Sequence, residues 1–244
     1  MHRFFSPQSN LNSAQITISD LSEIHHMRDV LRLKEGAKVV IFDGSGKEAA
    51  GIISRSKEQT ITIAIQSVSH SAPSRKAKII LACAIPKKTK FEFIIEKCTE
   101  LGVDEIIPLA TKRTEFRWDD ERIQKKAGRY KTVAINAAKQ SKRSTVPTIH
   151  PVSKFENTLV NFPPSTAGFI PCLIPDAKNL LSTFKISKEA RNVIFFIGPE
   201  GDFTPDEVAK AIKAGCTPVS LGKTVLKVDT AAISVVALAN LLLS

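Results

Sequence analysis

The sequence predicts an α/β protein in two parts: a small β-domain, then a larger domain built on a parallel sheet. Short apolar stretches of alternating pattern, separated by turn residues, fill residues 1–70 and are typical of short strands. Across residues 79–244, buried strands alternate with amphipathic helices, which is the pattern of a parallel α/β sheet. Residues 71–78 lie between the two patterns and are polar, basic and interrupted by a proline, so we expect a linker there.

The first part is expected to be a small β-barrel or sandwich. Its strand candidates are "AQITIS", "AKVVIFDG", "KEAAGIIS" and "QTITIAIQSV". One helix is expected in "SEIHHMRDVLRLKEG", and it ends in a basic cluster that includes Arg28 and Arg32. Together with Arg3, this cluster is a candidate phosphate-binding patch, although a solvated charged face would have the same sequence. His25 and His26 are adjacent and point in different directions from a helix, so we expect no shared metal site.

The second part begins with a strand in "KIILACAIP" and continues with a helix in "TKFEFIIEKCTELG", for which Thr89 and Glu92 predict a capping box and Gly102 a stop. A long helix with a basic face is expected in "DERIQKKAGRYKTVAINAAKQ". The other expected strands are "VDEIIPLA", "GFIPCLIP", "NVIFFIG" and "TPVSLG". In "TPDEVAKAIKAG", Thr204 and Glu207 predict a second capping box.

The last predicted helix, "TAAISVVALANLLL", is apolar around almost its whole circumference. A helix with one solvated face does not have this composition. The helix therefore lies either in the middle of the domain or between the domain and a second subunit.

Composition favours a nucleic-acid partner. The chain has 244 residues, and 35 lysines and arginines against 24 acidic residues give a net charge of +11. Such an excess favours a polyanion. We expect no membrane partner, because there is no basic amphipathic helix, lipidation motif or apolar leader. The four cysteines are far apart in sequence, which indicates free thiols in a reducing cytoplasm and no metal site.

A candidate ligand site follows the strand in "FFIGPEGDF". There an apolar run stops at Gly198, Pro199, Glu200 and Gly201, just before the predicted helix. Ligands of open α/β sheets bind at the carboxyl ends of strands, where glycines let the backbone approach them. The alternative is an ordinary tight loop that happens to contain an acid.

A second segment, "SLGKTVLKVDTAA", repeats this design before the last helix. Its "GKT" suggests a phosphate loop, but that motif needs a glycine five positions earlier, where Thr217 stands. We therefore expect the two strand ends to enclose a neutral or cationic cofactor.

The two loops, "IGPEGDFTPDEV" and "VSLGKTVLKVDTAA", resemble the signature loops of the SPOUT-class 16S ribosomal RNA uridine-N3 methyltransferases. The similarity extends upstream to "AINAAKQSKRSTVP" and reaches the N-terminus in "HRFF" and "HHMRDVLRLKEG", so it covers nearly the whole chain. The resemblance implies an N-terminal PUA-like β-barrel and a C-terminal SPOUT α/β domain with a trefoil knot. It also implies a homodimer, with 16S ribosomal RNA in the small ribosomal subunit as partner.

The same resemblance implies S-adenosylmethionine as the cofactor, bound in the knot. By matching position, the cofactor would contact Pro175, Ile197, Gly198, Gly201, Leu221, Gly222, Val225 and Leu226. The matching RNA contacts are Arg3, Arg28, Arg32, Arg113, Gln140 and Arg143.

The chain departs from the family pattern at several positions. Asp202 stands where the family usually has a second glycine, and Lys227 and Asp229 replace an arginine and a glutamate. Asn136 and Lys139 occupy places that are usually acidic. The lysine at position 227 lacks the planar fork of an arginine. These departures leave the predicted fold unchanged but affect the expected rate of methylation and the choice of target base.

Methylation of uracil N3 requires removal of a proton and stabilisation of the resulting charge. We expect Asp229 to act as the base and Lys227 to stabilise the charge, with Glu200 as a second candidate for orientation or base. The alternative is that these three charged residues have no catalytic role and only form ion pairs or keep the loops solvated. Two alternative functions remain: a non-catalytic RNA-binding ribosome-assembly factor, and a SPOUT methyltransferase acting on another RNA nucleotide.

Overall fold

The computed structural model describes residues 1–71, 75–86, 90–114, 120–161, 165–174, 177–187 and 189–244, with the backbone alone for residues 120–124. The chain forms two compact units. Unit 1 comprises Met1–Pro73 and Ile135–Val146, and unit 2 comprises Ser74–Ala134 and Pro147–Ser244. The division falls within the predicted linker, and unit 1 also includes a later segment that the sequence pattern did not assign to it. Each unit is described by itself below.

Unit 1 contains a five-stranded sheet with the order β1-β3-β4-β5-β2. Its strands are β1 (His2–Phe5), β2 (Gln15–Ile18), β3 (Lys38–Phe42), β4 (Lys47–Ser56) and β5 (Ile61–His70). β1 pairs with β3 in parallel, and the other pairs are antiparallel. A bulge interrupts the pairing of β4 with β5 at Gly51, where an added Cβ would lie 2.5 Å from the Ala64 carbonyl oxygen. Only glycine allows this close approach of the two strands.

The single helix predicted in unit 1 consists of two pieces, α1 (Leu21–His25) and the π-helical segment η1 (His26–Val30). Asp20 caps α1, because its Oδ1 accepts hydrogen bonds from the backbone N–H groups of Ser22 and Glu23. Ile24 and Met27 are fully buried against the sheet core. Buried apolar residues of α1 and of η1 both face the core. The spacing of apolar residues in the sequence therefore did not reveal that the second half of the helix is π-helical.

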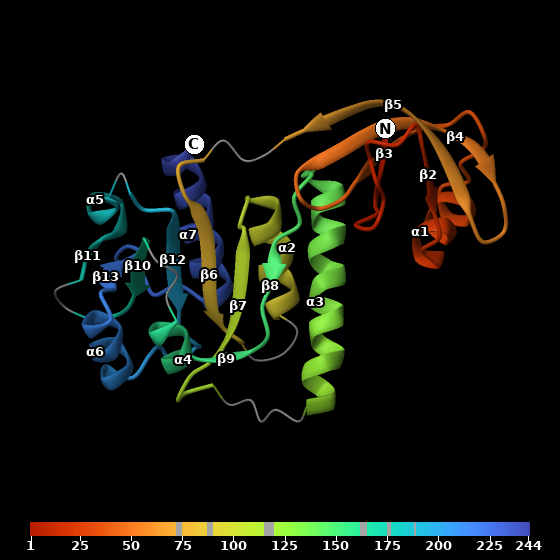
Figure 1. The fold of residues 1–244 in the computed structure, drawn as a ribbon. Coiled ribbons are helices and arrows are strands. Elements are labelled where there is room, and N and C mark those ends of the chain that lie inside the picture. Colours follow the sequence, from red (N-terminus) through yellow and green to blue (C-terminus); the bar gives the residue numbers. More distant parts are fainter. Residues whose placement is uncertain (72–74, 87–89, 115–119, 162–164, 175–176, 188) are drawn as a thin grey trace. The chain divides into compact units, whose positions relative to one another are not determined.

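Unit 2 is built on an eight-stranded parallel sheet, as the sequence predicts (Figure 1). The strand order is β11-β13-β10-β12-β6-β7-β8, and β9 also pairs with β7. The strands are β6 (Lys78–Ala84), β7 (Glu105–Ala110), β8 (Thr148–Ile149), β9 (Ser153–Lys154), β10 (Thr166–Pro171), β11 (Lys178–Asn179), β12 (Asn192–Ile197) and β13 (Thr217–Ser220). The α/β class is confirmed.

The remaining helices are α2 (Lys90–Glu100), α3 (Asp120–Gln140), α4 (Phe155–Val160), α5 (Leu180–Thr183), α6 (Pro205–Lys213) and α7 (Val228–Leu243). The capping box of Thr204 and Glu207 is present at the start of α6. Gly102 and Gly215 have positive φ angles of 97° and 93° after α2 and α6, as expected of helix-stopping glycines. Thr89, the predicted cap of α2, lies outside the described residues.

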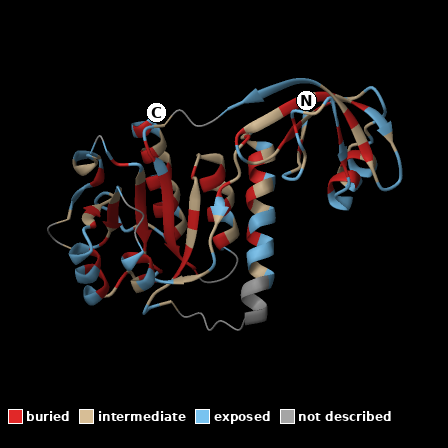
Figure 2. Ribbon diagram, viewed as in Figure 1, coloured by how far each residue is buried: buried red, intermediate tan, exposed pale blue. Residues whose placement is uncertain are grey.

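Helices cover both faces of the unit 2 sheet (Figure 1). One core cluster joins Ile80 of β6 and Phe196 of β12 to Phe155 of α4 and Val208 of α6. Because side chains alternate across a strand, the intervening residues of β6 and β12 face the other side, where α2 and α7 pack. Figure 2 shows that the central strands are buried along their length. Burial on both faces explains the continuous apolar runs in their sequences.

The structure also describes the cysteines, the groups that could bind a metal and the length of the apolar helices. The four cysteines are buried and free of disulfides. Among the described residues, no group of histidine, cysteine and acidic side chains could hold a metal ion. In the same part of the chain, no helix is long and apolar enough to cross a membrane.

Candidate functional site

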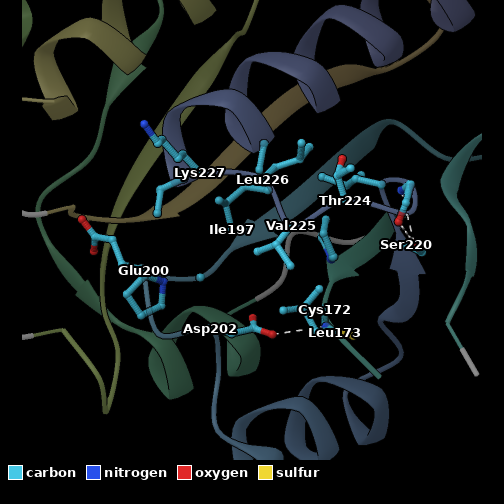
Figure 3. Close-up of a pocket in the computed structure, with 17 residues that line it drawn as sticks. Cys172, Leu173, Ile197, Glu200, Asp202, Ser220, Thr224, Val225, Leu226 and Lys227 are labelled. Atoms are coloured by element: carbon cyan, nitrogen blue, oxygen red, sulfur yellow. Dashed lines mark hydrogen bonds between the residues drawn. The ribbon is translucent and has the colours of Figure 1, made fainter. Parts of the chain in front are cut away.

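A cavity of about 280 Å³ lies at the carboxyl ends of β10, β12 and β13 in unit 2 (Figure 3). Three segments line it: Pro171–Leu173 after β10, residues 197–202 with the exception of Gly201 after β12, and residues 220–228 with the exception of Lys223 after β13. Ala231 of α7 completes the lining. The cavity is where an open parallel sheet usually binds its ligand, because several strand ends meet there.

The loop after β12 folds back tightly on itself at Gly198. A Cβ added there would lie 3.1 Å from the Phe203 ring and 3.2 Å from the Phe203 nitrogen. The sequence-based interpretation was that this glycine makes room for a ligand. The structure adds a second reason: a side chain at position 198 would crowd the buried ring of Phe203, which packs on Phe155 with ring centroids 4.9 Å apart.

Asp202 takes the left-handed conformation in this loop, with a φ angle of 59°. Glycine adopts that conformation most easily, and aspartate is among the residues that tolerate it. This explains how Asp202 can stand where the family usually has a glycine. Its carboxylate accepts hydrogen bonds from the N–H of Phe203 at 2.8 Å and of Leu173 at 3.2 Å. Asp202 therefore connects the loops after β12 and β10, two walls of the cavity.

The loop after β13 supplies the apolar wall. Gly222 has a φ angle of 134°, which a side chain would strain, and its N–H donates to the Ser220 hydroxyl at 3.2 Å. Val225 is 74% exposed although it is a branched apolar residue, and Leu173 on the opposite wall is 66% exposed. Exposed apolar side chains that line a cavity are typical of a binding site.

Two of the three charged side chains in the lining lie at one end of the cavity. Figure 3 shows Glu200 and Lys227 at that end, and Ser220 and Thr224 at the other. Lys227 is exposed and occupies the cap position of α7, where its backbone is extended. With Asp202, the lining contains two carboxylates and one ammonium group, so the cavity has an excess of negative charge that suits a cationic ligand.

Asp229 lies in the first turn of α7, two residues beyond Lys227, and does not line the cavity. Its Oδ1 atom is buried and has no hydrogen-bond partner within the described part of the chain. Burial raises the pKa of the Cys83 thiol well above its usual range, and the nearby charges of Cys98, Glu200 and Asp229 raise it further. Glu200, on the loop after β12, and Asp229, in the first turn of α7, therefore both approach the end of β6.

The structure brings most of the predicted cofactor-contacting residues together. The cavity lining contains Ile197, Gly198, Leu221, Gly222, Val225 and Leu226, and of the candidate catalytic residues Glu200 and Lys227. Pro175 lies outside the described residues. The sequence reasoning missed Cys172 and Leu173, because β10 ends at Pro171, earlier than the apolar run in "GFIPCLIP" indicates.

Gly201 is not part of the lining. A Cβ on Gly201 would meet the Arg113 side chain at 3.4 Å, which is an ordinary contact. Arg113 also donates a hydrogen bond to the Gly201 carbonyl oxygen. The exposed Arg113 is thus held beside the loop after β12.

The other candidate RNA contacts lie in unit 1. Arg32 and Gln140 are exposed, and Arg32 has a φ angle of 52°. Arg28 is held by the Asp29 carboxylate and the Glu58 carbonyl oxygen. Arg3 is largely buried and donates to Glu48 and to the Arg143 carbonyl oxygen, so it also has a structural role.

Comparison with known proteins places the chain in a family. Residues 73–240 match the family described as RNA methyltransferase domain. The chain belongs to the RNA methyltransferase domain family. Residues 18–66 match a second family, the RNA methyltransferase PUA domain, so a PUA-like domain precedes the α/β domain. The family match confirms the resemblance that the two glycine loops indicate.

Named relatives of this RNA methyltransferase cover most of its length. "Ribosomal RNA small subunit methyltransferase E" of Bacillus subtilis is 29% identical, with 86% of this chain and 83% of that protein covered. The Mesomycoplasma hyopneumoniae protein of the same name is 35% identical, with coverage of 65% and 67%.

Solved structures resemble the RNA methyltransferase over its full length. The enzyme of that name from Neisseria gonorrhoeae, bound to S-adenosyl methionine, is 28% identical, has a TM-score of 0.88 and covers 99% of this chain and 98% of its own. A Legionella pneumophila protein in complex with the cofactor SAM has the same TM-score and identity, with coverage of 98% and 97%.

Proposed function

We propose that this protein is an S-adenosylmethionine-dependent methyltransferase that modifies N3 of a specific uridine in 16S ribosomal RNA of the small subunit. The observation that carries the proposal is the cavity at three strand ends, in a chain that matches a cofactor-bound ribosomal RNA methyltransferase along its entire length. The name of the relatives supports the small-subunit substrate, and the two glycine loops support the uridine-N3 class.

The residues of the cavity fit this cofactor. Apolar side chains such as Ile197, Val225 and Leu226 provide a surface for an adenine ring, and the excess of carboxylates suits its sulfonium and ammonium charges. When bound, S-adenosylmethionine supplies an electrophilic methyl group. The protein has to orient the uracil, remove its N3 proton and exclude competing nucleophiles.

We assign the proton transfer to Asp229 and the charge stabilisation to Lys227. Asp229 Oδ1 is buried and has no partner among the described residues, so it can take the N3 proton once the bound uracil reaches the first turn of α7. Lys227 projects from the cap position of α7 at the charged end of the cavity, where its ammonium group can face the developing negative charge on the base. Glu200 on the neighbouring loop orients the base between them.

We also propose the finer features of the family fold. The trefoil knot is proposed from the resemblance of the two glycine loops to those of the SPOUT family. The match to the RNA methyltransferase PUA domain family supports a PUA-like barrel for unit 1, whose five-stranded sheet has β1 and β2 at its two ends.

The function is tested by incubating the protein with labelled S-adenosylmethionine and small ribosomal subunits that lack the modification. Digestion and mass spectrometry then identify the methylated nucleoside. We expect 3-methyluridine at one position. Another methylated nucleoside would mean a different target base. Cofactor binding without transfer to small subunits or to naked 16S RNA would contradict catalysis on this substrate and favour the assembly-factor function.

A glycine comparison tests how the loop after β12 holds the cofactor. We expect Gly198→Ala to lower the affinity for S-adenosylmethionine by ~10-fold or more, because the added methyl group would crowd Phe203 and the Asp202 carboxylate that accepts from its N–H, and so shift two parts of the loop; overpacked sites typically cost about 1–3 kcal/mol. Gly201→Ala is the matched control and should bind normally. Calorimetry measures both affinities. Equal losses in the two variants would contradict this account of the loop.

We further propose that the protein is a homodimer. One face of α7 packs on α2, β6 and β12, whereas Leu241 and Leu242 near its end are 75% and 41% exposed. The helix that is apolar all round is therefore only partly covered within its own unit. Two exposed leucines on one helix end are a suitable centre for a subunit interface.

The double variant Leu241→Lys, Leu242→Lys should be a monomer, because a dimer would bury two charges in an apolar contact. Sedimentation at micromolar concentration measures the change. Val160→Lys, at an even more exposed apolar residue of α4, should leave the dimer intact. A monomeric native protein would rule out the proposal.

A further inference from the structure

Of the two carboxylates in the described lining of the unit 2 cavity, Asp202 is the one that lies away from the lysine. Glu200 and Lys227 are both exposed and lie at the same end of the cavity. Asp202 is half-buried and lies on the side of Cys172 and Leu173 (Figure 3). Opposite charges at one end offset each other, and exposed charges are screened more than partly buried ones. The charge of Asp202 is therefore the least offset charge in the described lining.

Two backbone N–H groups hold the Asp202 carboxylate in position. Its Oδ1 accepts from the N–H of Phe203 at 2.8 Å, and its Oδ2 accepts from the N–H of Leu173 at 3.2 Å. These bonds use two acceptor positions, and an ionised carboxylate has about four. Both donors are neutral, and within the described part of the chain no cationic side chain forms an ion pair with Asp202. The carboxylate thus presents a fixed and unneutralised negative charge at the cavity wall.

The thiol of Cys172 responds to this charge. Cys172 follows β10, lines the cavity and is only 7% exposed. Burial raises the pKa of its thiol, and the nearby charge of Asp202 raises the pKa further, because it would repel a thiolate. A position where a second negative charge is disfavoured favours a positive one. The cavity wall formed by Asp202 and Cys172 is therefore suited to the cationic part of a ligand.

The cofactor and its product differ in charge at one atom. S-adenosylmethionine contains a positively charged sulfonium sulfur. When its methyl carbon passes to uracil N3, the C–S bond breaks, its electron pair stays on sulfur, and the N3 proton goes to the base. The product, S-adenosylhomocysteine, is a neutral thioether at that sulfur and is otherwise the same molecule. A cavity therefore distinguishes the two only through the methyl group and the charge, and a fixed carboxylate acts on the charge.

We propose that Asp202 is a specificity-determining residue that makes the cavity prefer the sulfonium cofactor to its neutral product. The carboxylate attracts the positive sulfur through its charge, and this attraction disappears once the methyl group has been transferred. The product then leaves more readily, so product inhibition is reduced. The inference rests on the proposed function, since it takes S-adenosylmethionine as the ligand of this cavity.

The test measures the Kd of S-adenosylmethionine and the Kd of S-adenosylhomocysteine by calorimetry on the full-length protein, and the ratio of the two is the readout. Asp202→Asn removes the charge, keeps nearly the same shape and tolerates the φ angle of 59°. We expect this variant to shift the ratio by about 5-fold or more in favour of S-adenosylhomocysteine, as the loss of an attraction between charges several ångströms apart implies. Asp202→Gly also adopts this backbone conformation and should shift the ratio in the same direction, which covers the case that asparagine disturbs the loop.

Glu189→Gln is the matched control, because it removes an exposed carboxylate of unit 2 outside the cavity lining, and it should keep the native ratio. If Asp202 only connects the loops, or binds a group that the two ligands share, its loss would weaken both ligands by the same factor. An unchanged ratio in both Asp202 variants would therefore overturn this inference and leave the proposed function intact. A native protein that binds neither ligand would contradict the proposed function itself, and this inference with it.

Discussion

Replacing Asp229 with asparagine should lower single-turnover methyl transfer to the small subunit by ~100-fold or more, the usual contribution of a general base. Asparagine has nearly the same shape but cannot take a proton. The affinity for S-adenosylmethionine should be unchanged, because Asp229 does not line the cavity. Raising the pH should partly restore the rate, since hydroxide then removes the N3 proton that the side chain no longer removes. Rapid-quench assays over a pH series measure this.

Glu200→Gln is the matched comparison, because Glu200 is the other carboxylate close to Cys83 and does line the cavity. If Glu200 only orients the base, its variant should lose less activity and show no rescue at high pH. The opposite result, with a pH-rescued loss at Glu200 and near-native turnover at Asp229, would transfer the role of the base to Glu200. Near-native turnover of both would exclude the two carboxylates as bases.

The order of helices and strands could be predicted in most of unit 2 because local signals there agree with the fold. The central strands are buried on both faces and read as continuous apolar runs, and α6 begins at a complete capping box. The position of the site followed from the same pattern, since glycines after two strands mark the carboxyl edge of the sheet. These properties depend on residues that are close together in sequence.

What could not be predicted depends on contacts between distant segments. The glycine at position 198 is explained by the close approach of Phe203. The positive charge of Lys139 is explained by its ion pair with Glu23, which lies 116 positions earlier in the chain. Residues 135–146 belong to unit 1 because their strand and helix partners are there, and no local pattern records this. Asp202 could have been noticed as a polar residue at a glycine position, but its bridge to Leu173 requires knowing that β10 and β12 are neighbours.

Lys227→Ala should lower methyl transfer by a similar factor, ~100-fold, because it removes the cation that faces the charge developing on the base. Unlike Asp229→Asn, this variant should gain little from a higher pH: hydroxide can remove the proton but cannot stabilise the anion within the cavity. Lys227→Arg is the informative control. It retains the charge and restores the residue that the family usually has at this position, so it should keep most of the activity. Lys223→Ala, on the same loop but outside the cavity lining, should have methyl-transfer activity close to that of the native protein.

If Lys227→Ala instead weakened the binding of S-adenosylmethionine and left the single-turnover rate at saturating cofactor unchanged, Lys227 would be a cofactor-binding residue. In that case, the charge on the base would have to be stabilised by another group, and Arg113 beside Gly201 is one described candidate outside the cavity lining.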